Sequence, residues 1–239
     1  MNKQFAIIGL DSFGRRALEE LIPLGVDILI IDKDEEVIEQ YKQDVSSAFV
    51  VDVTKIDTIT KIIPKTLDAV LIDLGDNMEA SILITNYLHE LGIKEIIARA
   101  ETDGHGNILK IVGATMVVFP NKEAVKRIVP LLISPLLLNY LPISKDLTIA
   151  EVKVPGDYRN KTLLESNIRS KYELVVIAVK SAEGEYQIIN PEYVFNEGDI
   201  ALVAGNEKHI SDFLQTPLVP KSRSFVKFFK KIITGFKNR

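Results

Sequence analysis

Cysteine is absent from this chain of 239 residues, and histidine occurs only three times, at scattered positions. The first absence excludes disulfide scaffolds, thiolate zinc sites and cysteine nucleophiles, and the second gives no reason to expect a histidine metal cluster. No run of 18 apolar residues occurs, so the sequence predicts no membrane-spanning helix. The opening residues, MNKQFAIIGLDSFG, enter a folded pattern without signal-peptide features, which predicts a cytoplasmic protein.

Charge is distributed unevenly along the chain. The net charge is −4, but residues 221–239 hold seven Lys and Arg and no acid, which leaves 22 basic and 33 acidic residues elsewhere. An acidic body argues against nucleic acid as the main partner. From Phe225 to Phe236 apolar residues recur at helical spacing beside lysines. This pattern favours an amphipathic helix at a membrane or a membrane partner, and packing on the acidic body is the alternative.

Apolar strands alternate with amphipathic helices through the first 120 residues. Helices are expected directly after the first strand and near 35–43, 55–63, 77–91 and 104–112. The expected strands lie at 4–9, 27–31, 47–51, 69–74, 95–98 and 115–119. Strands that are apolar on both faces indicate a parallel sheet covered by helices on both sides. The pattern therefore predicts an α/β fold with a Rossmann-like doubly wound sheet.

The second half of the chain changes character after a long apolar stretch at 124–141. Two prolines interrupt this stretch, and we expect either a helix buried in the first domain or a crossover or dimer helix. Residues 142–146 are expected to form a linker. Beyond it we expect strands at 147–154, 173–180, 186–189 and 199–204 and helices near 162–169 and 206–214. The predicted organisation is an N-terminal domain at 1–141, a smaller α+β domain at 142–216 and a basic tail at 217–239.

The first expected strand runs into a variant of the dinucleotide fingerprint G-x-G-x-x-G, here Gly9-Leu10-Asp11-Ser12-Phe13-Gly14. Asp11 takes the place of the second glycine, where the backbone approaches a pyrophosphate, and adds bulk and like charge there. Asp32 closes the second strand, where an acid bonds a ribose hydroxyl. Two interpretations stay open. Either the loop binds a nucleotide with Asp11 turned to solvent, or dinucleotide affinity is lost and Asp11 caps the following helix.

Further polar residues follow the other expected strands, at the edge where such sheets bind ligands. They are Asp52, Thr54, Gly75, Asp76, Asn77, Arg99 and Glu101. Arg99 is the only strong cation at these strand ends and could pair with a phosphate. Turn or cap chemistry is the alternative role for each of them. His105 lies in a Gly-His-Gly sequence, and we expect it to be a polar turn residue.

Segments along nearly the whole chain, to about residue 215, resemble the RCK-domain regulatory subunits of Ktr/Trk-type bacterial potassium uptake systems. The matching segments are FAIIGLDSFG (5–14), IIDKDEE (30–36), AFVVDVT (48–54), AVLIDLGDNMEASIL (69–83), HELGIKEIIARAET (89–102), ILKIVGATMVVFP (108–120), AEVKVPGDYRNKTLLESNIRSKYELVVIAVK (150–180) and GDIALVAG (198–205). They occur in the order found in the family.

The resemblance implies a non-enzymatic gating subunit. In that family the N-domain binds ATP, ADP or NAD(H), and in several bacteria the paired C-domains bind cyclic di-AMP. Homodimers commonly assemble into an octameric ring under a membrane-embedded potassium translocating subunit. The resemblance therefore implies a cytoplasmic protein peripheral to the inner face of the cell membrane. A small NAD(P)-dependent oxidoreductase is the alternative, and a DNA-binding regulator using the basic tail is a third.

By resemblance, two sets of residues would hold ligands. The nucleotide set is Gly9, Asp11, Ser12, Phe13, Gly14, Asp32, Lys33, Asp52, Val53, Gly75 and Arg99. The cyclic di-AMP set is Leu163, Leu164, Asn167, Ile168, Arg169 and Pro191. The aliphatic members could instead be dimer core. The chain departs from the family at Asp11 and again at Asn121, where a Glu usually follows the proline, which disfavours a cation-assisted ATP switch.

Overall fold

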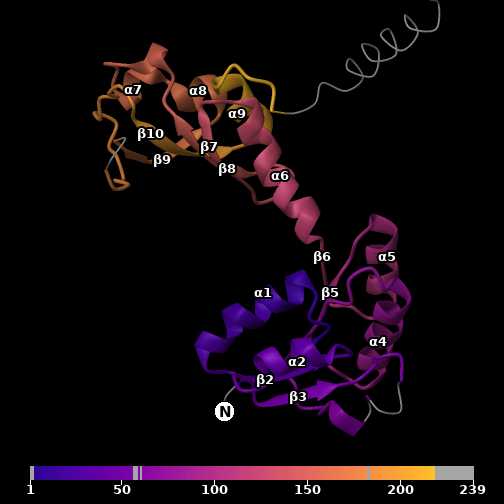
Figure 1. Ribbon diagram of the computed structural model, residues 1–239. Coiled ribbons are helices and arrows are strands. Elements are labelled where there is room, and N and C mark those ends of the chain that lie inside the picture. Colours follow the sequence, from indigo (N-terminus) through magenta and orange to yellow (C-terminus); the bar gives the residue numbers. More distant parts are fainter. Residues whose placement is uncertain (1–2, 56–58, 60, 182–183, 219–239) are drawn as a thin grey trace, which may run out of the picture. The chain divides into compact units, whose positions relative to one another are not determined.

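The computed structural model describes residues 3–55, 59, 61–181 and 184–218, and the chain divides into two compact units, Met1–Lys122 and Glu123–Arg239 (Figure 1). The basic tail lies outside the described residues from position 219 onward. Part of the helix expected near 55–63 also falls outside them. Among the described residues, no helix combines the length and apolar character needed to cross a membrane.

A six-stranded parallel sheet forms the centre of the first unit. Its strands are β1 (Gln4–Ile8), β2 (Asp27–Asp32), β3 (Ser47–Val50), β4 (Ala69–Ile72), β5 (Ile96–Arg99) and β6 (Met116–Val118). The spatial order is β3-β2-β1-β4-β5-β6, with every neighbouring pair parallel. The chain reverses direction across the sheet between β1 and β4, which is where open α/β sheets form a ligand crevice. This order confirms the predicted doubly wound fold.

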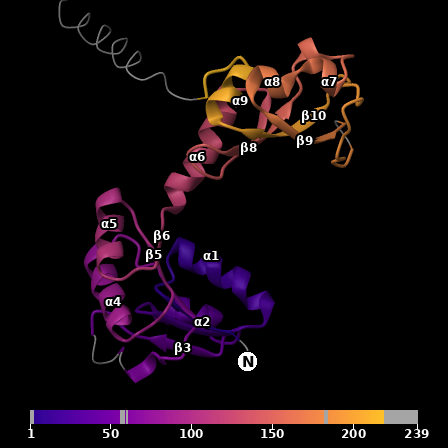
Figure 2. The same ribbon diagram turned by 180° about the vertical axis from the view of Figure 1, so that it is seen from behind.

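Helices cover both faces of this sheet (Figure 2). They are α1 (Ser12–Leu21), η1 (Ile22–Leu24), α2 (Glu35–Tyr41), α4 (Met78–Glu90) and α5 (Asp103–Ile111). Alternate residues along β1 enter different cores, because successive strand side chains point to opposite faces. Ile7 packs with Leu18 of α1 and Ile38 of α2, whereas Ile8 packs with Ile84 of α4 and Leu109 of α5. Both faces of the sheet are therefore buried.

The second unit contains a four-stranded antiparallel sheet. Its strands are β7 (Leu137–Pro142), β8 (Thr148–Lys153), β9 (Val175–Lys180) and β10 (Ile200–Gly205), in the order β7-β8-β10-β9. Its helices are η2 (Gly156–Tyr158), α7 (Leu163–Ser166), α8 (Ile168–Tyr172) and α9 (Glu207–Phe213). One core joins strands and helices around the fully buried Phe195 and Phe213. This arrangement is the predicted smaller α+β fold.

The apolar stretch at 124–141 is not one helix. Helix α6 (Pro120–Ile133) ends before Pro135, and β7 then begins at Leu137 as an edge strand of the second sheet. A proline disfavours helical backbone at the residue directly before it, which explains why α6 ends at this point. Most of α6 is exposed, including Leu132, so the first of the two alternatives, a helix buried in the first domain, is wrong.

Three other local expectations also differ from the structure. The linker expected at 142–146 is a hairpin turn, in which the Ile143 and Ser144 amides donate to the Leu147 carbonyl. The helix expected at 162–169 is two short helices, because Asn167 adopts left-handed backbone with φ 48°. The strand expected at 186–189 reduces to a single bridge between Gln187 and Val179.

Glu173 ends α8 with left-handed backbone (φ 54°), although it carries a side chain. We expect Glu173→Gly to stabilise the second unit by about 0.5–1 kcal/mol, because glycine adopts this conformation without the steric cost of a β-carbon. Chemical denaturation of the full chain measures the gain. Glu173→Ala is the matched control, since it removes the same carboxylate and the contact with His209 but keeps the β-carbon. An equal gain in both variants would contradict the conformational explanation.

Candidate functional site

A pocket of about 260 Å³ opens at the carboxyl ends of β1, β2 and β4. The turn after β1, the end of β2, the segment after β3 and the turn after β4 all contribute to its lining. From the predicted nucleotide set the pocket brings together Gly9, Asp11, Asp32, Lys33, Asp52, Val53 and Gly75. Ser12, Phe13, Gly14 and Arg99 are not among its lining residues. The crevice thus lies at the predicted edge of the sheet.

Asp32 is positioned by backbone donors on both of its carboxylate oxygens. The Leu10 amide donates to Oδ2 at 2.6 Å, and the Asp34 amide donates to Oδ1 at 2.9 Å. The bond from Leu10 joins the end of β2 to the turn after β1, and the bond from Asp34 is local to the segment after β2. Since a carboxylate oxygen accepts more than one hydrogen bond, Asp32 can still accept a hydrogen bond from a hydroxyl group of a ligand in the pocket. That is the chemistry expected of an acid at this position in a doubly wound sheet.

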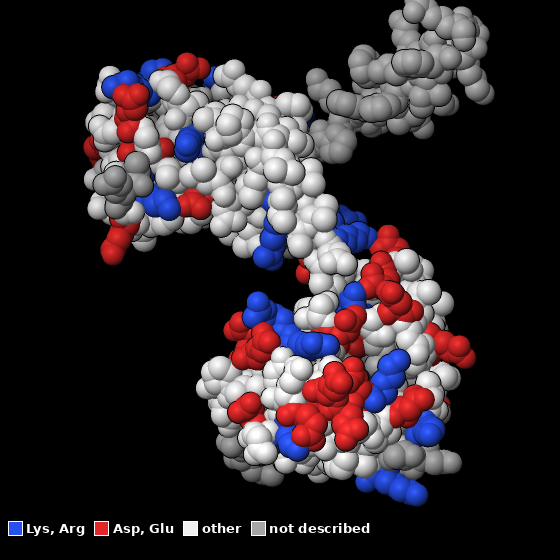
Figure 3. Space-filling model, in the orientation of Figure 1, with Lys and Arg blue, Asp and Glu red and all other residues white. Residues whose placement is uncertain are grey.

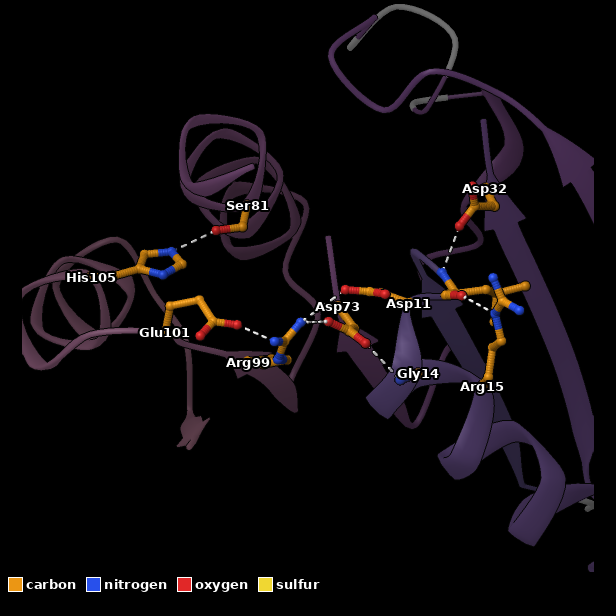
Figure 4. A network of polar contacts seen from close by, with 10 residues as sticks. Asp11, Gly14, Arg15, Asp32, Asp73, Ser81, Arg99, Glu101 and His105 are labelled. Atoms are coloured by element: carbon orange, nitrogen blue, oxygen red, sulfur yellow. Dashed lines mark hydrogen bonds and ion pairs between the residues drawn. The ribbon is translucent and has the colours of Figure 1, made fainter. Parts of the chain in front are cut away.

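The side chain of Asp11 does not take the helix-capping role that one of its two predicted interpretations gave it. Asp11 stands at the N-cap position of α1, but its side chain makes no capping hydrogen bond. Its carboxylate is also not simply turned to water, although its side chain is 52% exposed. Instead, Oδ2 accepts from Arg99 Nη1 at 3.2 Å (Figure 4). The capping role is therefore wrong, and Asp11 joins the first turn of the unit to the end of β5.

Arg99 is the centre of a network of three carboxylates. Its Nη1 also donates to Asp73 Oδ1 at 2.8 Å, and its Nη2 pairs with Glu101. The Arg99 side chain is only 11% exposed. Burial lowers the pKa of Arg99, but hydrogen bonding and charge from Asp73, with charge from Glu101 and Asp11, outweigh it and raise the pKa above its ordinary value. The guanidinium expected to meet a phosphate is thus already neutralised by the protein.

Asp73 is the residue that sequence reasoning missed. Its side chain is fully buried, and Oδ2 accepts from the Gly14 amide at 2.7 Å while Oδ1 accepts from Arg99. It thereby ties the N-terminal turn of α1 to the ends of β4 and β5. The available signal was an acid between Ile72 and Leu74 in an apolar strand, since a buried carboxylate requires partners.

The sequence suggested that His105 is a polar turn residue, and this prediction is wrong. It lies in α5, it is buried, and its Nε2 is 2.7 Å from Ser81 Oγ of α4. Burial lowers the pKa of His105. Its contact holds two helices together outside the pocket lining. Among the described residues, no group of three or more His, Cys, Asp or Glu side chains is placed to hold a metal ion.

The cyclic di-AMP set of residues gathers on one part of the second unit. The Leu163 and Leu164 amides at the start of α7 donate to the carbonyls of Tyr193 and Pro191, so Pro191 lies beside this helix. Leu164 is 72% exposed, and Asn167, Arg169 and Pro191 are exposed as well. Ile168 differs, since it is 2% exposed and belongs to the core of its own unit. Its side chain is therefore not available for stacking on a base.

The fold and the pocket define a class: a Rossmann-type unit with a pocket at the switch point of its sheet, followed by a small α+β unit, with no membrane-spanning helix among the described residues. The model of the TrkA-N domain matches residues 5–120, and the model of the TrkA-C domain matches residues 147–216. These two matches fall on the two sheets. The TrkA-C match starts at residue 147, directly before β8, so it does not include β7 of the second sheet.

The chain is 33% identical over 215 residues to Ktr system potassium uptake protein C of Bacillus subtilis, covering 89% of this chain and 96% of that protein. It is 29% identical over 212 residues to Ktr system potassium uptake protein A of the same organism, with the same coverage. A crystal structure of the GsuK RCK domain superposes with a TM-score of 0.62 at 19% identity, over 94% of this chain and 49% of that one. The chain therefore belongs to the RCK regulatory subunits of Ktr potassium uptake systems.

Membership in this family confirms the family resemblance and the prediction of a regulatory subunit rather than an enzyme. The alternative of an NAD(P)-dependent oxidoreductase is accordingly set aside. Neither the family nor the fold identifies the ligand of this chain. The similarity to the GsuK domain, at 19% identity, is evidence for the fold alone.

Proposed function

We propose that this chain controls potassium flow through a membrane-embedded translocating subunit by binding a nucleotide, ATP, ADP or NAD(H), in the pocket of its first unit. The observation that carries the proposal is the 33% identity across both units to a Ktr potassium uptake protein. The position of the pocket at the switch point of the sheet supports it. A ligand that binds two states of an assembly with different affinity shifts their populations, and no catalytic group is needed.

Asp32 would bond the ribose of the ligand, and Gly9 and Gly75 would let the backbone approach it. The two aspartate oxygens are already oriented by amides of neighbouring turns. A carboxylate here favours a ribose with free hydroxyls over one with a 2′-phosphate, because two negative charges would meet. We therefore propose NAD(H) rather than its phosphorylated form if the ligand is a dinucleotide.

We propose the exposed surface of α7 and α8 as a second ligand site, for cyclic di-AMP. Leu164 offers an apolar surface for an adenine, and Arg169 offers a cation for a phosphate. Asn167 and Pro191 complete the surface, and Leu163 is half-buried beneath it. Ile168 supports this surface from the core rather than lining it.

The chain is proposed to act as a homodimer that assembles into an octameric ring beneath the translocating subunit, at the cytoplasmic side of the membrane. Exposed apolar residues along α6 support an assembled state, since a surface of this kind favours protein contact. The boundary expected at 141/142 would divide β7, which pairs with β8 in the second sheet, and the two units divide instead between Lys122 and Glu123. We therefore propose domains at 1–122 and 123–216, followed by the tail at 217–239. The basic tail, whose sequence favours membrane contact, lies beyond the described residues.

Co-expression in a bacterium that lacks its own potassium uptake tests this function. A Ktr-type translocating subunit is expressed alone or with the full chain, and rubidium uptake is measured. We expect uptake to change at least severalfold when the chain is present, and we expect the two proteins to copurify. Unchanged uptake together with no copurification would contradict the proposal. Native mass spectrometry of the purified chain then reports the assembly mass and any retained nucleotide.

A further inference from the structure

We infer that Asp11 fills the phosphate end of this pocket with the protein's own negative charge, so that the pocket favours a nucleoside, or a nucleotide of low charge, over ADP and ATP. The inference rests on the proposed nucleotide pocket and specifies its ligand class. It concerns the position at which this chain departs from the G-x-G-x-x-G pattern.

The first observation is the saturation of Arg99. Three carboxylates, those of Asp11, Asp73 and Glu101, contact one guanidinium. The network thus carries a net charge of about −2 if all three acids are ionised. An incoming phosphate would have to displace a carboxylate from a side chain that is 11% exposed. A cation held in this way adds little attraction for a further anion.

The second observation concerns the backbone donors that surround a phosphate in this fold. The N-terminal turn of a helix binds anions through its free amides. Here the Gly14 amide donates to the buried Asp73, and the Leu10 amide donates to Asp32. Arg15, which lines the pocket, donates from Nε to the Leu10 carbonyl at 2.6 Å. Two amides and one guanidinium nitrogen near the turn are therefore engaged within the protein.

The third observation is the position of the Asp11 carboxylate. A β-carbon built on Gly75 would lie 2.7 Å from Asp11 Oδ2. The Asp11 carboxylate therefore lies directly against the turn after β4. It occupies the fingerprint position at which the backbone approaches a pyrophosphate. Figure 4 shows the Asp11 carboxylate beside that of Asp73, with dashed lines joining both to Arg99.

The charge of the pocket as a whole acts in the same direction. Its ionisable lining residues are Asp11, Arg15, Asp32, Lys33, Asp34, Asp52 and Asp73, which are five acids and two bases. Acidic side chains also gather on the face of the first unit seen in Figure 3. Each phosphate charge brought to this end of the pocket meets net repulsion, whereas an uncharged ribose and base meet hydrogen-bond acceptors.

The test compares adenosine with ADP, using calorimetry on the full chain. We expect the native chain to bind adenosine at least about tenfold more tightly than ADP. Asp11→Asn keeps the size of the side chain and removes its charge, and Asp11→Gly restores the fingerprint. Both variants are expected to bind ADP at least about tenfold more tightly than the native chain, with adenosine affinity changed less than about threefold.

Asp44→Asn is the matched control, because it makes the same chemical change at an exposed aspartate of the first unit that neither lines the pocket nor pairs with Arg99. We expect it to change either affinity by less than about threefold. A native chain that binds ADP as tightly as adenosine, or Asp11 variants that gain nothing for ADP, would overturn the inference and leave a nucleotide pocket in place. Folded native and variant chains that bind neither adenosine nor ADP would overturn the inference, and the absence of any retained nucleotide in native mass spectrometry would overturn the proposed nucleotide ligand as well.

Discussion

Replacing Gly9 by alanine is expected to destabilise the first unit by about 3 kcal/mol or more. Gly9 has φ +83°, a left-handed conformation in which a side chain is strained. A β-carbon there would overlap the carbonyl oxygen of Asp73 and lie 2.7 Å from its carbonyl carbon. Because these are backbone atoms of the residue directly after β4, the overlap cannot be relieved by rotating a side chain. The turn after β1 would have to move away from β4.

Thermal and chemical unfolding of the full chain measure this effect, with the transition of the first unit assigned by a probe in that unit. Gly25→Ala is the matched control. Gly25 also has positive φ (+66°), but a β-carbon on it would meet no atom within 4 Å. We expect Gly25→Ala to lower the free energy of unfolding of the first unit by only about 1 kcal/mol. Equal losses in the two variants would show that the conformation, and not the approach of β1 to β4, accounts for the effect.

Replacing Asp73 by alanine is expected to cost about 2–3 kcal/mol of stability in the first unit. The change leaves the Gly14 amide without its acceptor and removes the acceptor at 2.8 Å from Arg99. Arg99 keeps Asp11 and Glu101, which limits the loss. Asp73→Asn should cost less than Asp73→Ala, because an amide oxygen still accepts one of the two hydrogen bonds.

Glu101→Gln serves as the comparison for Asp73 in unfolding experiments. Glu101 contacts the same guanidinium but is partly exposed, so its loss is expected to cost less than about 1 kcal/mol. If Glu101→Gln were as destabilising as Asp73→Ala, the stabilisation would come from the charge balance of Arg99. The buried bond to the Gly14 amide would then have no special part in it.

The doubly wound sheet could be predicted because its causes are local in the sequence. Runs such as residues 28–31 are apolar on both faces, and a parallel sheet with helices on both sides is the arrangement that buries such strands. The same reasoning placed Gly9, Asp32 and Gly75 at one edge, since carboxyl ends of parallel strands share an edge. All three do line the pocket.

Some elements could not be predicted because their outcome depended on a neighbour distant in sequence. Residues 137–142 became a strand only through pairing with β8, although the same apolar pattern is compatible with a helix. His105 lies in a helix that was expected, but its burial and its contact with Ser81, 24 residues away, depend on how α4 and α5 pack together. Asn167 interrupted a helix in a conformation that most residues avoid.

The sequence alone was sufficient to predict an α/β unit followed by a smaller α+β unit, a glycine turn and a nearby acid in the first of them, and the departure of Asp11 from the phosphate-binding pattern. Only the tertiary structure decided what Asp11 does. Its partner Arg99 lies 88 residues further along the chain, and both meet Asp73 from a third strand end. Hydrophobic periodicity specifies which face of an element is buried, but an ion pair depends on where separate strand ends meet in space.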